Sequence, residues 1–126
     1  MATRSLIGIL TKSNTVESVY CHFDGYPEGV GARLARYYTT AEKAENLLSF
    51  GNISSLGVTT ADTVFYSRDR NESLENNKAR TSFGFTQYQE QAKGSGCEYA
   101  YIFRNGEWEV IDLLEGWVKK VKEAIK

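Results

Sequence analysis

The dipeptide Asn105-Gly106 constrains the fold of this chain more than any other feature of its sequence. It separates two strand-like runs, 97–104 and 107–111, that are rich in aromatic and β-branched residues. A two-residue type I′ turn needs positive φ at both central positions, and Asn-Gly satisfies that need best. The turn therefore predicts a hairpin of fixed register. The expected cross-strand pairs are Phe103 with Trp108 and Tyr101 with Val110 on the core face, and Arg104 with Glu107 and Ile102 with Glu109 on the other.

A second hairpin is expected near the start of the sequence. Residues 5–10 and 16–23 are apolar runs, and the polar cluster 12–15 separates them. The sequence Asp24-Gly25-Tyr26-Pro27 then ends the second run, because proline cannot continue a strand ladder.

Two short helices are expected after this break. The first has apolar residues at i, i+4, i+7 and i+8, which places them on one face. Thr39 and Glu42 fit a capping box for the second helix, and Gly51 suits the position just beyond its end. The expected buried residues are Val30, Leu34, Tyr37 and Tyr38 in the first helix, and Ala41, Ala44, Leu47 and Leu48 in the second.

The end of the sequence predicts a third helix. Asp112 and Glu115 fit a helix start, and an apolar stripe runs on to Ile125. We interpret the lysines beside this stripe as a solvated helix face. In the middle, 62–67 is typical of a strand, whereas 82–93 allows no assignment. We expect the polar stretch 68–80 to be a mobile surface loop, because it buries too little to offset its ordering entropy.

Together these elements predict an α+β fold over residues 1–126 as a single domain, which suits the length of the chain. The expected sheet is mainly antiparallel, with hairpins at both chain ends and helices on one face. Two short helices follow the first hairpin, and an amphipathic helix ends the chain.

Charge and composition exclude several classes of function. The chain has 15 Lys and Arg against 16 Asp and Glu, and a net charge of −1 argues against a nucleic-acid or anionic-membrane partner. No apolar run approaches the roughly 20 residues that span a bilayer, and the first residues do not resemble a signal peptide. We therefore expect a cytoplasmic protein in which Cys21 and Cys97 are reduced thiols.

One segment, 20–31, concentrates residues suited to a binding site. It contains the only His, the only Pro and one of the two Cys. Strand alternation would place Tyr20, His22 and Asp24 on one side, so we expect a hydrogen bond between His22 and Asp24. Cys21 would face the opposite way, which argues against a Cys–His dyad. The candidate binding residues are Tyr20, His22, Asp24, Gly25, Tyr26, Glu28 and Arg33.

Other interpretations of this segment remain open. The backbone of 27–31 precedes a helix and could receive an anion, although its spacing matches neither a P-loop nor a dinucleotide fingerprint and Glu28 would repel phosphate. A purely structural role is the plainest alternative, with His22 satisfied by Asp24 and the glycines allowing close packing. The spacing of His and Cys predicts no metal site, and nothing indicates a cofactor.

Four stretches of the sequence carry a resemblance: 1–10, 19–28 with its Tyr-Cys-His-x-Asp-Gly-Tyr-Pro motif, 52–57 and 99–108. They resemble small proteins of unknown function encoded by tailed bacteriophages. The resemblance covers both ends of the chain but not the polar middle. It implies a phage origin and expression in a bacterial cytoplasm, and it supplies no catalytic residues.

The favoured hypothesis is a non-enzymatic phage accessory protein that binds a host protein or a small signalling ligand in the host cytoplasm. The sequence holds eight Tyr, six Phe and two Trp, and aromatic faces stack on bases while Arg holds phosphate. One alternative is a small hydrolase or nuclease with His22 as general base, oriented by Asp24. Another is a structural component of the virion. Assembly into a homo-oligomer is left open.

Overall fold

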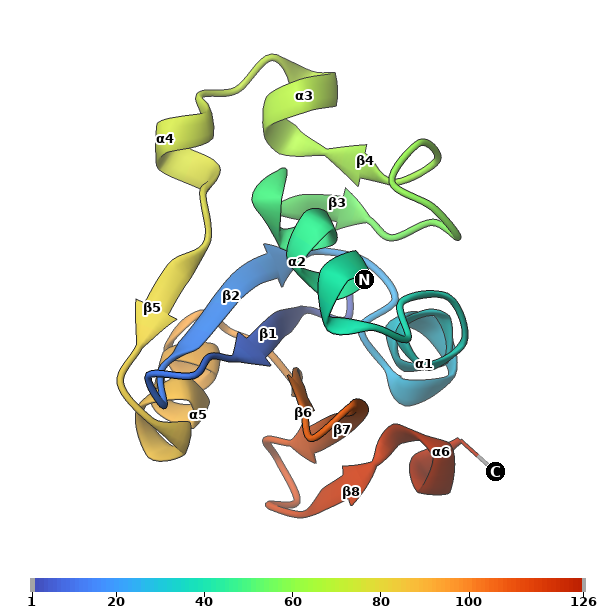
Figure 1. The fold of residues 1–126 in the computed structure, drawn as a ribbon, viewed down its shortest axis with the longest axis vertical. Helices are drawn as coiled ribbons and strands as arrows, with labels where there is room; N and C mark the ends of the chain where they lie inside the picture. The colour runs from blue at the N-terminus through green and yellow to red at the C-terminus, as the bar shows by residue number, and fades with distance from the viewer. Residues whose placement is uncertain (1, 126) are drawn as a thin grey trace.

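The computed structural model describes residues 2–125, and these residues form one sheet of eight strands (Figure 1). β1 (Ser5–Leu10) is central, because β2 (Val16–Cys21) pairs with one edge and β6 (Tyr99–Arg104) with the other. The strand order is β4-β3-β2-β1-β6-β7-β8, and β5 also pairs with β2. The other strands are β3 (Ile53–Ser55), β4 (Val64–Phe65), β5 (Arg80–Ser82), β7 (Glu107–Asp112) and β8 (Val118–Lys120).

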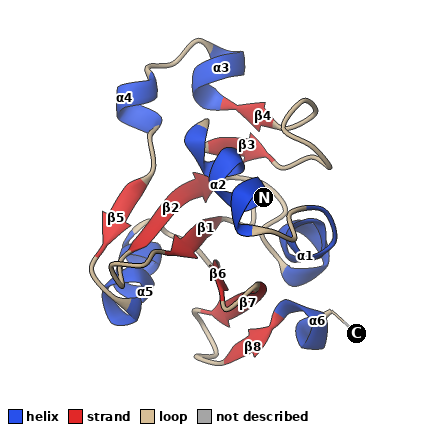
Figure 2. Cartoon of the chain, in the orientation of Figure 1, coloured by secondary structure: helices blue, strands red, loops and turns tan. Residues whose placement is uncertain are grey.

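Short helices cover both faces of this sheet (Figure 2). β1 is apolar on both sides, so Ile7 enters one core and Leu6 the other. The first core is closed by α1 and α2, and the second by α5. The expectation of helices on one face is wrong, because strands apolar on both sides need cover on both. The helices are the π-helical turn η1 (Pro27–Gly31), α1 (Ala32–Tyr37), α2 (Ala41–Ser49), α3 (Tyr66–Arg70), α4 (Leu74–Asn77), α5 (Phe85–Gly94) and α6 (Val121–Ala124).

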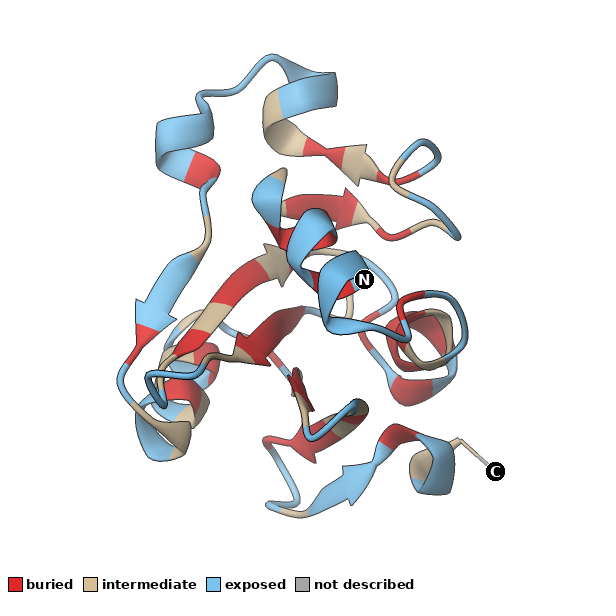
Figure 3. Cartoon of the chain, in the orientation of Figure 1, coloured by how far each residue is buried: buried red, intermediate tan, exposed pale blue. Residues whose placement is uncertain are grey.

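The predicted α+β class is confirmed, but the predicted strand arrangement is matched only in part. The β1/β2 and β6/β7 hairpins form, and all four expected cross-strand pairs of β6 and β7 are present. However, β1 pairs with β6 and β2 with β3 in parallel. These two pairings join segments that are distant in sequence, and no turn signal encodes them. Figure 3 shows the buried residues gathered in the central strands and the exposed ones along α3, α4 and β8.

The turn between β6 and β7 offers a clean test of backbone conformation. Asn105 and Gly106 have φ of 54° and 77°, and a Cβ added at Gly106 would meet nothing within 4 Å. Gly106→Ala should therefore lower the free energy of unfolding by about 1–2 kcal/mol through the left-handed backbone alone. Urea denaturation measures the loss. Gly94→Ala is the matched control, because a Cβ there also meets nothing, yet the residue lies in α5. An equal effect at both positions would contradict this account of the turn.

The predicted C-terminal amphipathic helix starting at residue 112 is wrong. Asp112 ends β7, and its Oδ1 accepts hydrogen bonds from the backbone N–H groups of Leu114 and Glu115 at 2.9 and 2.8 Å. Gly116, at φ 82°, then reverses the chain into β8, and only the short α6 is helical. An aspartate that accepts from the N–H groups two and three residues later occurs in turns as well as at helix starts. The Asp112 motif therefore could not distinguish a turn from a helix start.

Smaller differences appear in the first helices. Thr40, not Thr39, caps α2, where its hydroxyl accepts from the N–H of Lys43 at 3.2 Å. Gly51 adopts the expected left-handed conformation beyond the helix. Tyr38 is buried as predicted, but Tyr37 and Ala41, which were also expected to be buried, are exposed.

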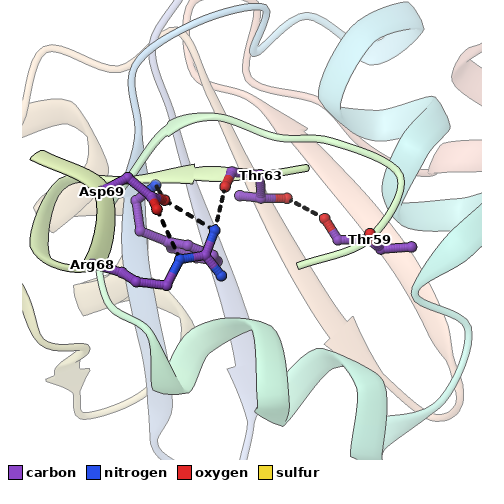
Figure 4. Close-up of polar contacts among 5 residues, drawn as sticks. Thr59, Thr63, Arg68 and Asp69 are labelled. Atoms are coloured by element: carbon purple, nitrogen blue, oxygen red, sulfur yellow. Dashed lines mark hydrogen bonds and ion pairs between the residues drawn. The ribbon is translucent and has the colours of Figure 1, made fainter. Parts of the chain in front are cut away.

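The polar stretch 68–80, predicted as a loop, contains the end of α3, all of α4 and the start of β5. Polar contacts organise its beginning (Figure 4). The Arg68 guanidinium donates to the carbonyl of Thr63 and to the carboxylate of Asp69, both at 2.9 Å, and lies over the Phe65 ring. The Thr63 hydroxyl donates to the Thr59 carbonyl at 2.7 Å. Prediction from apolar burial alone missed this secondary structure because polar side chains satisfy the backbone here.

Candidate functional site

The junction between β2 and α1 is fixed by close backbone contacts. The N–H of Gly25 donates to the Thr3 carbonyl at 2.8 Å, and its own carbonyl accepts from the Tyr101 hydroxyl at 2.6 Å. A Cβ at Gly25 would lie 2.7 Å from the Thr3 oxygen and 2.9 Å from the Ser5 Cβ. Gly25 is therefore a packing residue rather than a ligand contact, because two chain segments meet where a side chain would stand.

His22 does not pair with Asp24 as we expected. Its Nδ1 shares a 2.7 Å hydrogen bond with the Tyr20 hydroxyl, whereas Asp24 accepts from the hydroxyl of Tyr26 at 3.4 Å. Strand alternation holds only while the backbone is extended. β2 ends at Cys21, and Asp24 adopts φ 59°, so the carboxylate turns away from the strand's register.

The two cysteines offer no reactive nucleophile. Both thiols are free, and they belong to cores on opposite faces of the sheet, so Cys21 and Cys97 do not pair. Burial raises the pKa of each thiol to about 12. Both groups are therefore protonated at neutral pH, and only a thiolate is strongly nucleophilic.

Four of the candidate residues line one open groove of about 730 Å³: Asp24, Tyr26, Glu28 and Arg33. α1 adds Arg36 and Tyr37 to the lining, and α6 adds Lys122. Small residues of η1 and α1 leave the space open. Tyr26 is 40% exposed and Tyr37 37%, so both aromatic side chains are accessible. Tyr20, His22 and Gly25 lie outside this groove.

The charges of the groove favour an anionic ligand. Its lining carries three cations, Arg33, Arg36 and Lys122, against the two carboxylates of Asp24 and Glu28. Within residues 2–125, none of these five side chains forms a salt bridge. The groove therefore has a net positive charge, and no salt bridge within the described part of the chain neutralises its three cations.

The alternative of an anion held by the backbone of 27–31 finds no support. The N–H of Gly29 already donates to the Tyr26 carbonyl at 2.9 Å, and the N–H of Val30 donates to the Asp24 carbonyl at 2.8 Å. η1 is a single turn of five residues that starts with Pro27, which has no N–H, so two of its four N–H groups are already used inside the chain. The side chains of the groove, not its backbone, are the groups available to a ligand.

Sequence reasoning missed three charged or aromatic residues of the groove, Arg36, Tyr37 and Lys122. Arg36 follows Arg33 at i+3 on α1, a spacing that puts two side chains next to each other and could have revealed it. Tyr37 was assigned to the core because it falls at i+7 of the apolar period. Lys122 comes from the other end of the chain, and no local signal connects it with the junction.

Comparison with protein-family models, curated proteins and solved structures finds no match for this chain. Over residues 2–125, no helix has the length and apolar character needed to cross a bilayer. The same residues contain no group of three or more His, Cys, Asp or Glu side chains placed to hold a metal ion.

Proposed function

We propose that this chain is a non-enzymatic bacteriophage accessory protein whose groove binds a small anionic ligand with an aromatic ring in the host cytoplasm. One observation carries the proposal: three cations without ion partners and two accessible tyrosines line the same groove of about 730 Å³. That volume lies within the range of about 300–1,000 Å³ found for small-molecule sites. The resemblance of the sequence to phage proteins supports the proposed origin.

The lining suits a nucleotide-like signalling molecule. The guanidinium groups of Arg33 and Arg36 bind phosphate or carboxylate through paired N–H donors. The rings of Tyr26 and Tyr37 offer faces on which an aromatic ring of the ligand can stack, because aromatic pairs prefer offset-stacked or edge-to-face arrangements. Carboxylates accept hydrogen bonds only, so Glu28 would receive an amino or hydroxyl group of the ligand. An apolar compound would leave these charged groups unsatisfied.

Binding is supported over turnover by the position of His22. The only histidine of the sequence lies outside the groove lining and shares its hydrogen bond with Tyr20. A general base must reach the proton it removes from a bound substrate. A ligand in the groove would therefore meet cations, tyrosine hydroxyls and the carboxylates of Asp24 and Glu28, but not the imidazole of His22.

Calorimetric titration with AMP, GMP and cyclic di-GMP tests the proposal. At least one is expected to bind, and Arg33→Ala or Arg36→Ala should weaken it by roughly ten- to a hundredfold, as for the loss of a charged hydrogen bond. Saturation at about 100 times Kd should also raise the free energy of unfolding by about 2.7 kcal/mol.

The matched control is Lys93→Ala, which removes an exposed cation from α5, away from the groove. The Lys93→Ala variant should bind the nucleotide with the same affinity as the unchanged protein. The proposal fails if none of the three compounds binds, or if the arginine variants bind as well as the control. Capture of a host protein by this surface, abolished by the arginine variants, would replace the small ligand with a protein partner.

A further inference from the structure

A second, polar pocket of about 400 Å³ opens where β3 and β5 share one edge of β2. β5 pairs with β2 only from Val16 to Ser18, and β3 pairs with it only at Cys21. Between these contacts, the backbone N–H of Tyr20 donates to the side-chain oxygen of Asn52 at 2.9 Å. The two strands part along β2 (Figure 1), and the residues that line the pocket come from β1, β2, β5 and α5 and from Asn52 and Ser95 beside them.

The lining of this pocket contains hydrogen-bond donors and no carboxylate. Arg80 supplies a guanidinium group that forms no salt bridge within residues 2–125. It lies opposite Ser18 in the β2/β5 register, and directly opposed residues share one face of a sheet. Gln91 accepts from the Ser82 hydroxyl through Oε1 at 2.5 Å, which leaves its amide Nε2 as a donor toward a ligand.

Ser18 is the least expected member of this lining. Ser18 is only 2% exposed, and its Oγ has no hydrogen-bond partner in the part of the chain that the structure describes. Buried hydroxyls are nearly always hydrogen-bonded, because an unpaired one costs free energy. Ser18 borders the pocket, so a rotation of its side chain would bring this buried hydroxyl to a group bound there.

We propose that this pocket binds an oxyanion, the phosphate or carboxylate group of a small molecule. Arg80 neutralises its charge, while the Ser18 hydroxyl and the Gln91 amide donate hydrogen bonds. Without a carboxylate in the lining, nothing in the pocket repels such a group. The site lies against α5, whereas the groove of the proposed function is formed by η1, α1 and α6, so the two sites stand independently.

Titration of the ¹⁵N-labelled protein with inorganic phosphate, and separately with acetate, tests this site by amide chemical shifts. We expect saturable shifts at Tyr20, Asn52 and Ser95. Ser18→Ala and Arg80→Gln should each weaken phosphate binding by about tenfold or more, the effect of losing one charge-assisted hydrogen bond. Lys43→Ala on α2 is the control and should bind normally. If only phosphate causes shifts, the ligand of the pocket is a phosphate ester. If both phosphate and acetate cause shifts, the pocket accepts oxyanions in general.

A stability measurement separates ligand binding from a structural role of Ser18. Because its hydroxyl has no partner, Ser18→Ala should leave the thermal midpoint of the ligand-free protein unchanged or raise it. A clear fall in that midpoint would show an internal hydrogen bond and overturn the proposal. So would the absence of shifts with either probe, or normal binding by both variants. Shifts confined to Gly29 and Arg33 would overturn this pocket while supporting the groove.

Discussion

Replacing Trp108 with alanine is expected to lower the free energy of unfolding by about 3–5 kcal/mol, the usual cost of removing a buried aromatic side chain. Trp108 is 4% exposed, and its ring lies 5.1 Å from that of Phe103. Its Nε1–H also donates to the Tyr38 carbonyl at 2.7 Å, which ties β7 to the end of α1. Alanine would open a cavity and leave that carbonyl unpaired. Chemical denaturation followed by circular dichroism measures the loss.

Two further variants divide this effect into its parts. Trp108→Phe keeps an aromatic ring beside Phe103 but removes the N–H donor, so the loss should fall to about 1–3 kcal/mol. Phe83→Ala removes an aromatic side chain that is 74% exposed, and it should change stability by no more than about 0.5 kcal/mol. If Trp108→Ala were as mild as Phe83→Ala, Trp108 would not be the core residue described above.

Features set by neighbouring residues were predictable, and those set by distant pairing were not. Asn105-Gly106 determines a turn whose geometry belongs to the dipeptide itself, and the register of β6 and β7 follows from it. The parallel pairing of β1 with β6 depends on segments about 90 residues apart, which compete with other strands for the same edge. The apolar stripe after Asp112 was compatible with a helix, but the turn at Gly116 and pairing with β7 favoured a strand.

In the candidate site, too, contacts between residues close in sequence were predictable and contacts between distant segments were not. Asp24, Tyr26, Glu28 and Arg33 were found because they are close in sequence and a short turn keeps them close in space. The expected contact of His22 with Asp24 failed because β2 ends at Cys21 and Asp24 adopts φ 59°, so the break predicted at Asp24-Gly25 begins before the carboxylate can follow the strand alternation. Ser18 and Arg80 could not be linked from sequence, since only the pairing of β2 with β5 places them side by side.

Replacing Tyr101 with alanine should cost about 3–5 kcal/mol of unfolding free energy, and replacing it with phenylalanine about 1–3 kcal/mol. Tyr101 is fully buried in β6, and burial raises the pKa of its hydroxyl, which stays protonated as a donor to the Gly25 carbonyl. Its ring also packs beside Gly31, where a Cβ would lie 3.1 Å from the tyrosine Cε1. Tyr101 thus supports the junction that carries the groove without lining it.

Tyr101→Phe therefore connects the fold with the proposed function. Loss of the bond to Gly25 should loosen the turn that positions Asp24 and Tyr26. The proposed nucleotide binding should therefore weaken, although every residue of the groove lining is retained. Tyr88→Phe is the matched control: its buried hydroxyl donates to the Tyr101 carbonyl at 2.5 Å, on the side of the sheet covered by α5. It should lose similar stability and keep full affinity. Of these two tyrosines, only Tyr101 contacts the junction through its hydroxyl. Equal losses of affinity in both variants would therefore mean that general destabilisation, not the bond to Gly25, weakens binding.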